Sequence, residues 1–574
     1  MVSKRISSKG KLRNLKQQAY YRFLITAVII VLLNILAGTT VQRIDLTADQ
    51  RFTLNDSTRS MLRNLKDRVF VKVYITGELP AGFKRLENAT RDLLNEFRSI
   101  AGNNVQYEFE DPLLNKSQEE RKKIYEEMAA EGLQPTNIQT AKSDAYSEKI
   151  ILPGATVFYR GKETTINLLL NDNGVGAQRA LNNSVAKLEN KFASAIKKLD
   201  MDERIRIALL RGNDDAPLYK LYDLLNALSE FYQIDTLNIQ STTVIPKQYT
   251  SLLIVGPTQP YSEQNKFKID QFIMNGGRVL WLLDNMRASA DSVKNKASFL
   301  ALDMGLNLDD QLFTYGVRLN PALIMDLQCN PVPLLVNYIN NQPEFRLFPC
   351  YYFPILTPYN KHIINKEIDA VNTSFCSPID TANNRIKKTV LLASSRKTKT
   401  AFTPWQVDFR ILKNQPDEKS FSKGFLPAAV LLEGQFASVF NNRLQPEFES
   451  LLRDSLKQEF RNRSKETKMI IVGDADIALN DFNAQGRPFS LGYFRYTQEF
   501  FANKNFLLNG IDYLNDRNDR ILTRAKDIKL RLLDTEKVKA QKLTWQLMNI
   551  IAPIALIILF GLIYTFIRLR RFAV

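Results

Sequence analysis

Residues 249–285 read YTSLLIVGPTQPYSEQNKFKIDQFIMNGGRVLWLLDN, and this stretch determines the predicted fold of the central region. Two mainly apolar runs, YTSLLIVGP at 249–257 and RVLWLLDN at 278–285, have the length of buried strands. A helical pattern that ends at Gly276 and Gly277 separates them. A strand, a helix and a second strand in this order form a crossover unit with parallel strands. The stretch therefore predicts an α/β domain with a parallel, doubly wound sheet.

The same alternation of strands and helices extends in both directions along the chain. RIRIALLRG at 204–212, QIDTLNI at 233–239 and MIIVGD at 469–474 are further predicted strands. Ligands of open parallel sheets bind outside the carboxyl ends of the strands. The candidate ligand contacts predicted at these ends are Arg211, Asn213, Asp284, Asn285 and Asp474.

Two carboxylates one residue apart, Asp474 and Asp476, follow the last of these strands. A single histidine in the chain leaves few ligands for a transition metal. A hard cation held by oxygen atoms is the alternative. We expect instead that Asp474 shapes the turn and caps the next helix by accepting its free N–H groups. The sequence thus predicts no metal site and no cofactor.

The strand, helix and strand of 249–283 resemble the class I glutamine-amidotransferase-like fold. Active members of that fold have a nucleophilic cysteine at the end of the second strand, where this chain has Asp284 and Asn285. His362, predicted in an exposed loop, would be the only base for a Cys–His or Ser–His pair. The chain also lacks a P-loop, so any ATPase must be a separate polypeptide. The prediction is a protein that is not an enzyme.

The three cysteines have no CxxC spacing, which argues against a zinc or dithiol redox site. Their odd number leaves at least one free thiol, and their pairing stays open. They are Cys329, Cys350 and Cys376.

Residues 42–200 are predicted to form a separate α/β domain. Its strands and helices follow in the order βαβαββα, with a hairpin of two predicted strands, 149–160 and 163–170, joined at Gly161 and Lys162. This order matches a thioredoxin-like domain, and without a CxxC pair its expected role is a docking platform. Residues 201–525 then form the amidotransferase-like domain, with an insertion around 305–385 of short strands and many prolines.

Two apolar segments flank these domains. The first, 23–41, is barely long enough to span a membrane, and a cleaved signal peptide is its alternative interpretation. The second, 545–567, contains no charge and predicts a transmembrane helix. Helices associate in a bilayer through close packing and polar contacts. The residues predicted to pack against partner helices are Asn34, Asn549, Pro553 and Gly561.

The net charge of +18 is concentrated beside these segments. The tail 1–22 is basic and free of acids, and arginines recur in the tail 568–574. The positive-inside rule places both tails in the cytoplasm and 42–544, with a juxtamembrane helix at 526–544, across the membrane. The basic excess therefore indicates membrane topology and not a nucleic-acid partner.

Several motifs follow one another in a specific order over nearly the whole chain. After the basic N-terminus and the first apolar segment come RFTLNDSTRSMLRNLKDRVFVKVYITGELP, FEDP, LLEGQFASVF, IIVGDADIALND, NFLLNGIDYLND and a C-terminal membrane helix. This order resembles the gliding-associated ABC-transporter auxiliary family GldG of Bacteroidota. The resemblance implies an inner-membrane protein with periplasmic domains, a requirement in gliding motility, and a complex with a permease subunit and a cytoplasmic ATPase subunit.

The resemblance also implies an amidotransferase-like central domain without catalytic residues. We therefore expect a non-catalytic auxiliary subunit with a scaffold or coupling role. A tethered periplasmic protein that binds carbohydrate or peptidoglycan fragments is the alternative. The number of copies stays open, with two per complex as one option.

Overall fold

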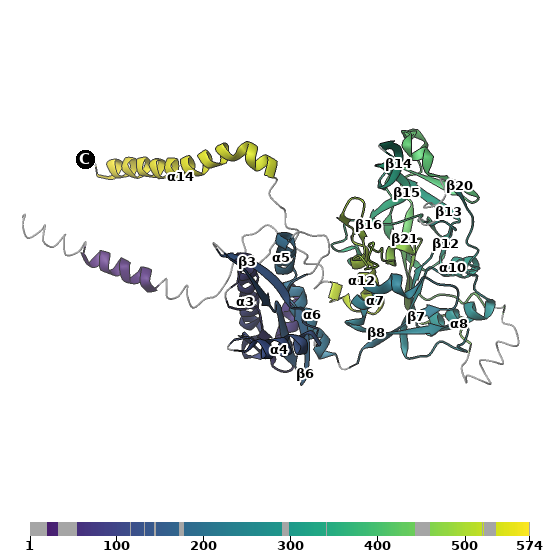
Figure 1. Cartoon of the computed structure of the whole chain (residues 1–574), viewed down its shortest axis with the longest axis horizontal. Helices are drawn as coiled ribbons and strands as arrows, with labels where there is room; N and C mark the ends of the chain where they lie inside the picture. Colours follow the sequence, from purple (N-terminus) through teal and green to yellow (C-terminus); the bar gives the residue numbers. More distant parts are fainter. Residues whose placement is uncertain are drawn as a thin grey trace, which may run out of the picture. The chain divides into compact units, whose positions relative to one another are not determined.

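A computed structural model of the chain (Figure 1) contains two helix-covered sheet regions and a long C-terminal helix. The structure describes residues 20–32, 54–77, 79–114, 116–130, 132–142, 145–170, 177–201, 203–289, 298–339, 341–441, 443, 460–518, 520–521 and 535–572.

Residues 55–200 contain a mixed four-stranded sheet in the order β2-β1-β5-β6. Strand β1 is parallel to β2 and antiparallel to β5, which is antiparallel to β6. In β1, Val69, Val71 and Val73 are buried and alternate with more exposed residues, as a half-buried strand requires. Helices α3 and α6 bury apolar stripes that include Phe97 and Phe192. The elements are α2 Asp56–Arg63, β1 Val69–Val73, α3 Ala81–Ala101, η1 Gly102–Asn104, β2 Val105–Phe109, α4 Gln118–Ala130, β3 Thr136–Lys142, β4 Ala145–Ile151, β5 Gly154–Tyr159, β6 Lys162–Asn167, α5 Ala177–Ala186 and α6 Leu188–Asp200.

The predicted order βαβαββα is present here, but two details of the prediction are wrong. The run 149–160, predicted as one strand, is interrupted before β5 at Pro153, which cannot donate a backbone hydrogen bond. Strand β4 pairs with β3 instead. The turn between β5 and β6 lies at Arg160 and Gly161, one residue earlier than predicted. Both residues have positive φ (52° and 71°), as a two-residue hairpin turn requires.

A ten-stranded sheet in the order β14-β15-β18-β21-β22-β10-β9-β7-β8, with β16 beside β15, forms the central region. The strands from β22 to β8 are parallel, as predicted. The strands β21, β18, β15 and β14 are antiparallel, so the sheet is mixed and the predicted parallel sheet is only the part from β22 to β8. Between β15 and β21 the chain has no α-helix to make a crossover, and neighbouring strands therefore run in opposite directions. The strands are β7 Ile205–Arg211, β8 Tyr232–Asn238, β9 Tyr249–Val255, β10 Arg278–Leu282, β14 Cys329–Ile339, β15 Gln342–Pro358, β16 Val371–Asn372, β18 Lys387–Ala393, β21 Pro427–Gly434 and β22 Thr467–Val472.

Alternate side chains of the parallel strands enter hydrophobic cores on opposite faces of the sheet. In β9, Leu253 and Val255 belong to the core that includes α7 and α12, whereas Leu252 and Ile254 belong to the core that includes α8 and α10. This half of the sheet therefore has helices on both faces, as in a doubly wound sheet. The helices are η2 Leu218–Leu221, α7 Tyr222–Ser229, α8 Glu263–Met274, α10 Asp309–Tyr315, η7 Asp476–Ala478 and α12 Asn503–Leu514.

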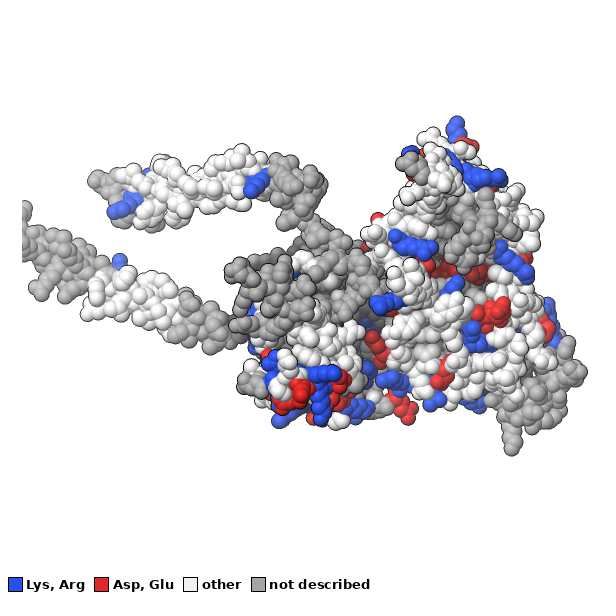
Figure 2. Space-filling view, viewed as in Figure 1, with Lys and Arg blue, Asp and Glu red and all other residues white. Residues whose placement is uncertain are grey.

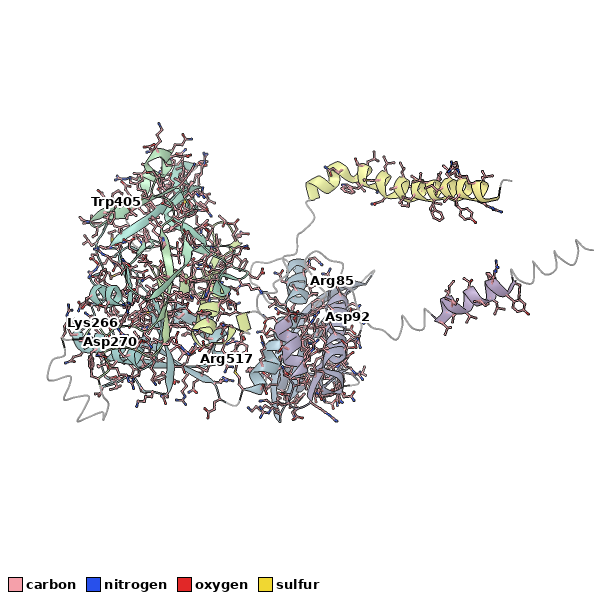
Figure 3. The ribbon with its side chains drawn as sticks, turned by 180° about the vertical axis from the view of Figure 1, so that it is seen from behind. Arg85, Asp92, Lys266, Asp270, Trp405 and Arg517 are labelled. Carbon is pink, nitrogen blue, oxygen red and sulfur yellow. The ribbon has the colours of Figure 1, made fainter. Side chains whose placement is uncertain are left out.

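Two buried charges fix helix α8 to distant parts of the chain (Figure 3). The Lys266 ammonium, with its side chain 1% exposed, donates to Asp310 at 2.7 Å. The Asp270 carboxylate accepts from the Tyr315 hydroxyl at 2.9 Å and from the Ser438 hydroxyl at 2.7 Å. Buried charges are tolerated when they are paired and hydrogen-bonded in this way.

Residues 298–426 add a β-rich region whose core is aromatic. Tyr352 and Phe353 of β15 pack with Phe375 and Phe409, with centroid distances of 5.4–6.4 Å. Several of the short strands predicted for 305–385 are present, with two to five residues each, but the prediction missed the long hairpin of β14 and the 17-residue β15. The further elements are β11 Ser298–Ala301, β12 Val317–Leu319, β13 Ala322–Asp326, η3 Ile363–Asn365, β17 Ile379–Thr381, β19 Thr398–Phe402, β20 Trp405–Asp408, η4 Phe409–Lys413, η5 Glu418–Ser420, β23 Tyr493–Phe494 and β24 Glu499–Phe500.

Helix α14, Thr535–Phe572, is the one helix of the described chain that is long and apolar enough to cross a membrane. Its surface carries basic residues near both ends and none between them (Figure 2). Asn549, Pro553 and Gly561 all lie in this helix at exposed positions, and the helix continues through Pro553.

The first apolar segment is described only as a shorter helix, Tyr20–Leu32. Two membrane-spanning helices, as the sequence predicted, are therefore not seen in the described chain. Residues 33–41, including Asn34, lie outside the described residues.

Candidate functional site

The candidate site is the carboxyl edge of the parallel strands, where the strand register brings two carboxyl groups together. Leu282 of β10 pairs with Val472 of β22, so Asp284 and Asp474 occupy equivalent positions two residues beyond that pair. Asp284 Oδ1 accepts the backbone N–H of Ala475 at 2.8 Å, which ties the two strand ends together. The sequence prediction that these two residues meet at one edge is consistent with this geometry.

Asp474 is fully buried and accepts two backbone N–H groups. One comes from Asp476 at 2.7 Å and forms the turn before η7, as the sequence predicted. The other comes from Ser374 at 2.7 Å, a residue 100 positions earlier in the chain. The predicted helix cap is wrong, because the N-cap residue of η7 is Ala475 and no side chain caps it. Asp474 therefore shapes a local turn and also holds the β-rich region against the sheet edge.

The electrostatics of this pair follow from its burial. Burial, together with the nearby carboxyls of Asp476 and Asp284, raises the pKa of Asp474 well above its usual range. Burial also raises the pKa of Asp284 to about 6. Burial is the main cause of the raised thiol pKa of Cys376, and the nearby carboxyls of Asp474 and Asp284 raise this pKa further. Carboxyl groups with raised pKa values are a common feature of catalytic sites, so access to them decides their role.

The segment 374–377 covers this edge. Ser377 donates its N–H to the Gly473 carbonyl at 2.7 Å. A Cβ atom added at Gly473 would lie 2.1 Å from the Ser377 carbonyl oxygen, so this close approach requires glycine. Asn285 donates its amide to the Leu319 carbonyl at 2.9 Å, and the cavity beside it measures about 10 Å³, the size of one water site.

Arg211 is the last residue of β7 and Asn213 lies in the loop after it, and the hydrogen bonds of both side chains stay within the loops of this edge. The Arg211 guanidinium donates to the carbonyls of Ala216 and Asp215. Asn213 donates its amide to the Pro260 carbonyl at 3.0 Å. Its Oδ1 atom is buried without a hydrogen-bond partner among the described residues. The structure thus bonds Asp474 to the covering segment, Asp284 to the neighbouring strand end and Asn285 to Leu319. The side chains of Arg211 and Asn213 instead shape a separate loop.

The sequence did not predict which residues of the β-rich region bond to the carboxyl edge. Ser374 and Ser377 bond to the edge through their backbone N–H groups, which every residue type except proline possesses. The one local signal was Gly473 between an apolar strand and a carboxylate.

His362 is not the exposed loop residue that the sequence predicted. Its side chain is partly buried, its Nδ1 atom accepts the N–H of Ile364 at 3.3 Å, and its ring packs on Tyr513 with centroids 4.8 Å apart. Burial lowers the pKa of the imidazole. His362 therefore serves as the N-terminal cap of η3.

The three cysteines are free thiols, and burial raises the pKa of Cys329 to about 12. Within the described ranges, no group of three or more His, Cys, Asp or Glu residues is arranged to hold a metal ion.

Residues 204–510 match a protein family described as an ABC-type uncharacterized transport system. This match covers more than half of the chain, and the protein belongs to this family of ABC transport auxiliary proteins. Residues 48–158 match a second family, a domain of unknown function, DUF7088. Membership of this family implies an accessory role in an ABC transport system. It also implies permease and ATPase partners in general terms. No curated protein matches the chain.

Two solved structures are similar to about half of the chain. The mmIFT52 N-terminal domain has 9% identity and a TM-score of 0.30, covering 54% of this chain and 97% of its own. A thua-like protein from Parabacteroides merdae has 10% identity and a TM-score of 0.26, covering 54% of this chain and 90% of its own.

Proposed function

We propose that the protein is a non-catalytic, membrane-anchored subunit of an ABC transport complex, in which its large folded region acts as a scaffold or coupling element. The closed carboxyl edge carries this proposal. Ser374 and Ser377 bond to the strand end at Asp474 and Gly473, where a substrate would otherwise enter. A sheet edge that is closed to substrate in this way suits a scaffold or coupling subunit.

The finer assignment is a GldG-type subunit in gliding motility, at the bacterial inner membrane. Both tails, 1–22 and 568–574, would lie in the cytoplasm and 42–544 in the periplasm. The sheet order β2-β1-β5-β6 supports a thioredoxin-like domain over 42–200 that serves as a docking platform. Residues 201–525 would be an amidotransferase-like domain without its nucleophile, and two copies per complex remain one option.

Recovery of the complex from native membranes tests the proposal. Full-length protein with a C-terminal tag, extracted in mild detergent, is expected to bring down a permease and an ATPase, identified by mass spectrometry. Recovery of the protein without either partner, from membranes in which another tagged ABC complex stays intact, would overturn it.

A matched pair of variants tests partnership through the membrane helix. Replacing Asn549, Pro553 and Gly561 together by leucine removes the polar and small groups that favour helix packing, and should weaken recovery of the permease. The control replaces Leu556, Leu559 and Leu562 by isoleucine in the same helix. Equal recovery of the permease with both variants would mean that any assembly runs through the folded region.

One observation favours the alternative, a tethered binder of carbohydrate or peptidoglycan fragments. The Asn213 Oδ1 atom is a buried acceptor without a partner in the described chain, and it lies among the predicted ligand contacts. Calorimetric titration of the full-length protein with such fragments should show no saturable binding if the scaffold proposal holds. Saturable binding that Asn213→Ala or Asp284→Ala abolishes, with unchanged melting of the variants, would replace the scaffold by the binder.

A further inference from the structure

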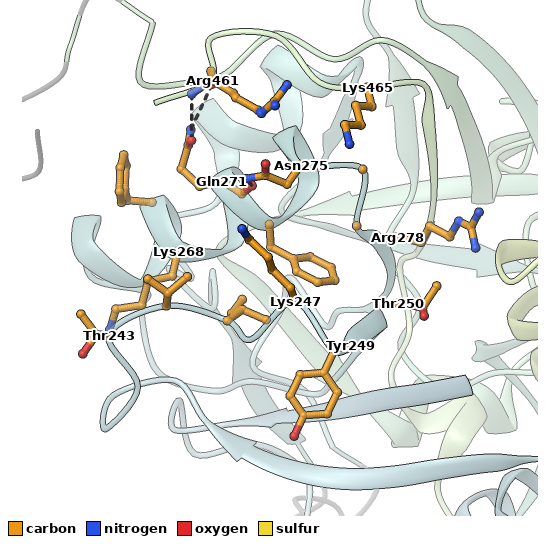
Figure 4. Close-up of a pocket in the computed structure, with 16 residues that line it drawn as sticks. Thr243, Lys247, Tyr249, Thr250, Lys268, Gln271, Asn275, Arg278, Arg461 and Lys465 are labelled. Carbon is orange, nitrogen blue, oxygen red and sulfur yellow. Dashed lines mark hydrogen bonds between the residues drawn. The ribbon is translucent and has the colours of Figure 1, made fainter. Parts of the chain in front are cut away.

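A second candidate site lies at the opposite, amino edge of the same sheet. A cavity of about 480 Å³ opens where β9 and β10 begin, beside the end of helix α8 (Figure 4). Strand β9 contributes Tyr249, β10 contributes Arg278, and the turn after α8 contributes Asn275. None of the predicted ligand contacts lines this cavity.

The charged side chains that line the cavity are all positive. Five cationic side chains and no Asp or Glu occur among the described residues that line it. Arg278 is paired with Asp516 at 2.5 Å. Within the described chain, Lys247, Arg461 and Lys465 form no ion pair with a carboxylate. The five cations are Lys247, Lys268, Arg278, Arg461 and Lys465.

The cations converge from separate parts of the chain. Lys247 precedes β9, and Figure 4 shows its ammonium directed toward the end of α8 from the side opposite Lys465. Lys268 projects from α8 and donates to the Ile239 carbonyl at 2.8 Å. Burial lowers the pKa of this ammonium, as expected for a partly dehydrated charge. Like charges brought together in a hollow repel each other, and a bound anion relieves that repulsion.

The walls of the cavity are fixed before any ligand arrives. The Gln271 side chain exchanges two hydrogen bonds with the backbone of Arg461, at 3.0 and 3.1 Å, which positions this arginine at the rim. Helix α8 is itself held by the buried contacts of Lys266 and Asp270 described above. A Cβ atom at Gly277 would lie 2.2 Å from the Phe272 ring, so the turn after α8 closes tightly against the helix.

The cations could instead serve only to neutralise the C-terminal end of α8. The last carbonyls of the helix already have backbone partners, however. The carbonyls of Gln271, Phe272 and Ile273 accept from Asn275, Gly277 and Gly276, and that of Met274 accepts from the N–H of Lys465. No lysine or arginine side chain is needed to satisfy them.

We propose that this cavity binds a phosphorylated ligand with an apolar or ring-shaped part. Arginine and lysine groups suit the multiple charges and oxygen atoms of a phosphate group. The buried aromatic side chains of Tyr249, Phe267 and Phe272 in the lining suit the uncharged part. The phosphate could belong to a free metabolite or to a phospholipid headgroup, and both offer the same chemistry. This inference goes beyond the proposed scaffold role and does not depend on it.

The experiment uses the full-length protein in a neutral detergent at constant ionic strength, set with sodium chloride. Inorganic pyrophosphate and short-chain phosphatidylglycerol, below its micelle concentration, are titrated separately by calorimetry. Saturable binding of either probe is expected, and the stronger of the two identifies the source of the phosphate. Absence of saturable binding for both probes would overturn the proposal.

A matched pair of double variants locates the binding. Lys247→Gln combined with Lys465→Gln removes two cavity charges, and at least tenfold weaker binding is expected. Lys361→Gln combined with Lys423→Gln removes the same charge from exposed lysines outside the cavity and should bind like the unmodified protein. Equal weakening in both double variants would indicate unspecific attraction to net charge, and unchanged binding in the first would place the anion elsewhere. Either result rejects the site.

Discussion

The two edges of the central sheet differ in what lies over them. At the carboxyl edge, segment 374–377 bonds to Gly473 and Asp474, and the cavity beside Asn285 has room for about one water molecule. At the amino edge a cavity of about 480 Å³ is lined by five cations. Ligands of doubly wound sheets normally bind at the carboxyl edge. A rule about sheet topology therefore locates a ligand site only when no later segment of the chain fills that edge of the sheet.

The largest effect is expected from Gly473→Ala, which tests how tightly the carboxyl edge is closed. The added Cβ would lie 2.1 Å from the Ser377 carbonyl oxygen, a backbone atom that cannot move aside alone. Overpacking of this kind should cost about 3 kcal/mol of unfolding free energy, measured by denaturant titration. Gly561→Ala, where a Cβ meets no atom within 4 Å, is the control and should not destabilise. Equal stability of both variants would show that the edge is loosely covered.

Asp474→Ala should have the next largest effect. It leaves the N–H groups of Ser374 and Asp476 without their acceptor in a buried place, at a cost of about 2 kcal/mol. Magnesium, calcium or EDTA should leave the melting temperature of the unmodified protein unchanged, because the carboxylate is occupied by backbone donors. A metal-dependent rise in melting temperature that Asp474→Ala removes would contradict this interpretation.

Asp284→Asn should change the pH dependence of stability. The pKa of Asp284 in the folded protein, about 6, is raised above its unfolded value, so the folded state binds the proton more tightly. This contribution is complete below about pH 4 and is lost as pH rises to about 7. Asparagine keeps an acceptor for the Ala475 N–H and carries no charge. The variant should therefore gain stability relative to the unmodified protein between pH 4 and about 7. Curves of unfolding free energy against pH that run parallel for the two proteins would refute this prediction.

The smallest effect on stability is expected at the amino edge. Lys247→Gln with Lys465→Gln removes charges that have no carboxylate partner in the described chain, so unfolding free energy should change by at most about 0.5 kcal/mol. A loss of several kcal/mol would mean that these lysines support the fold, and the contrast between a structural edge and a binding edge would disappear.

Local sequence patterns predicted the parallel half of the central sheet well, because strands such as β9 and β10 are continuous apolar runs with a capped helix between them. The sequence also indicated β18 and β21 as strands of this sheet, but it did not predict their antiparallel direction, which depends on how distant segments return and not on their own residues.

The candidate site was predicted only in part for the same reason. Gly473 and Asp474 stood out in the sequence, but their partners Ser374 and Ser377 bond through backbone atoms that leave no trace in residue type. The basic cavity was missed because its cations lie far apart along the chain, from Lys247 to Lys465, and converge only in the folded protein.

The long hairpin of β14 and β15 has a consequence for solubility. Strand β14 is the last strand of its sheet and carries exposed Tyr338 and Ile339, features that favour unwanted pairing with another chain. Its residues Pro331 and Pro333 lack N–H groups, and proline is tolerated in such a ladder where the missing donor would point away from the partner strand. Two consecutive outward donors are therefore missing from the free edge, which makes β14 a poor template for an incoming strand and guards the protein against aggregation.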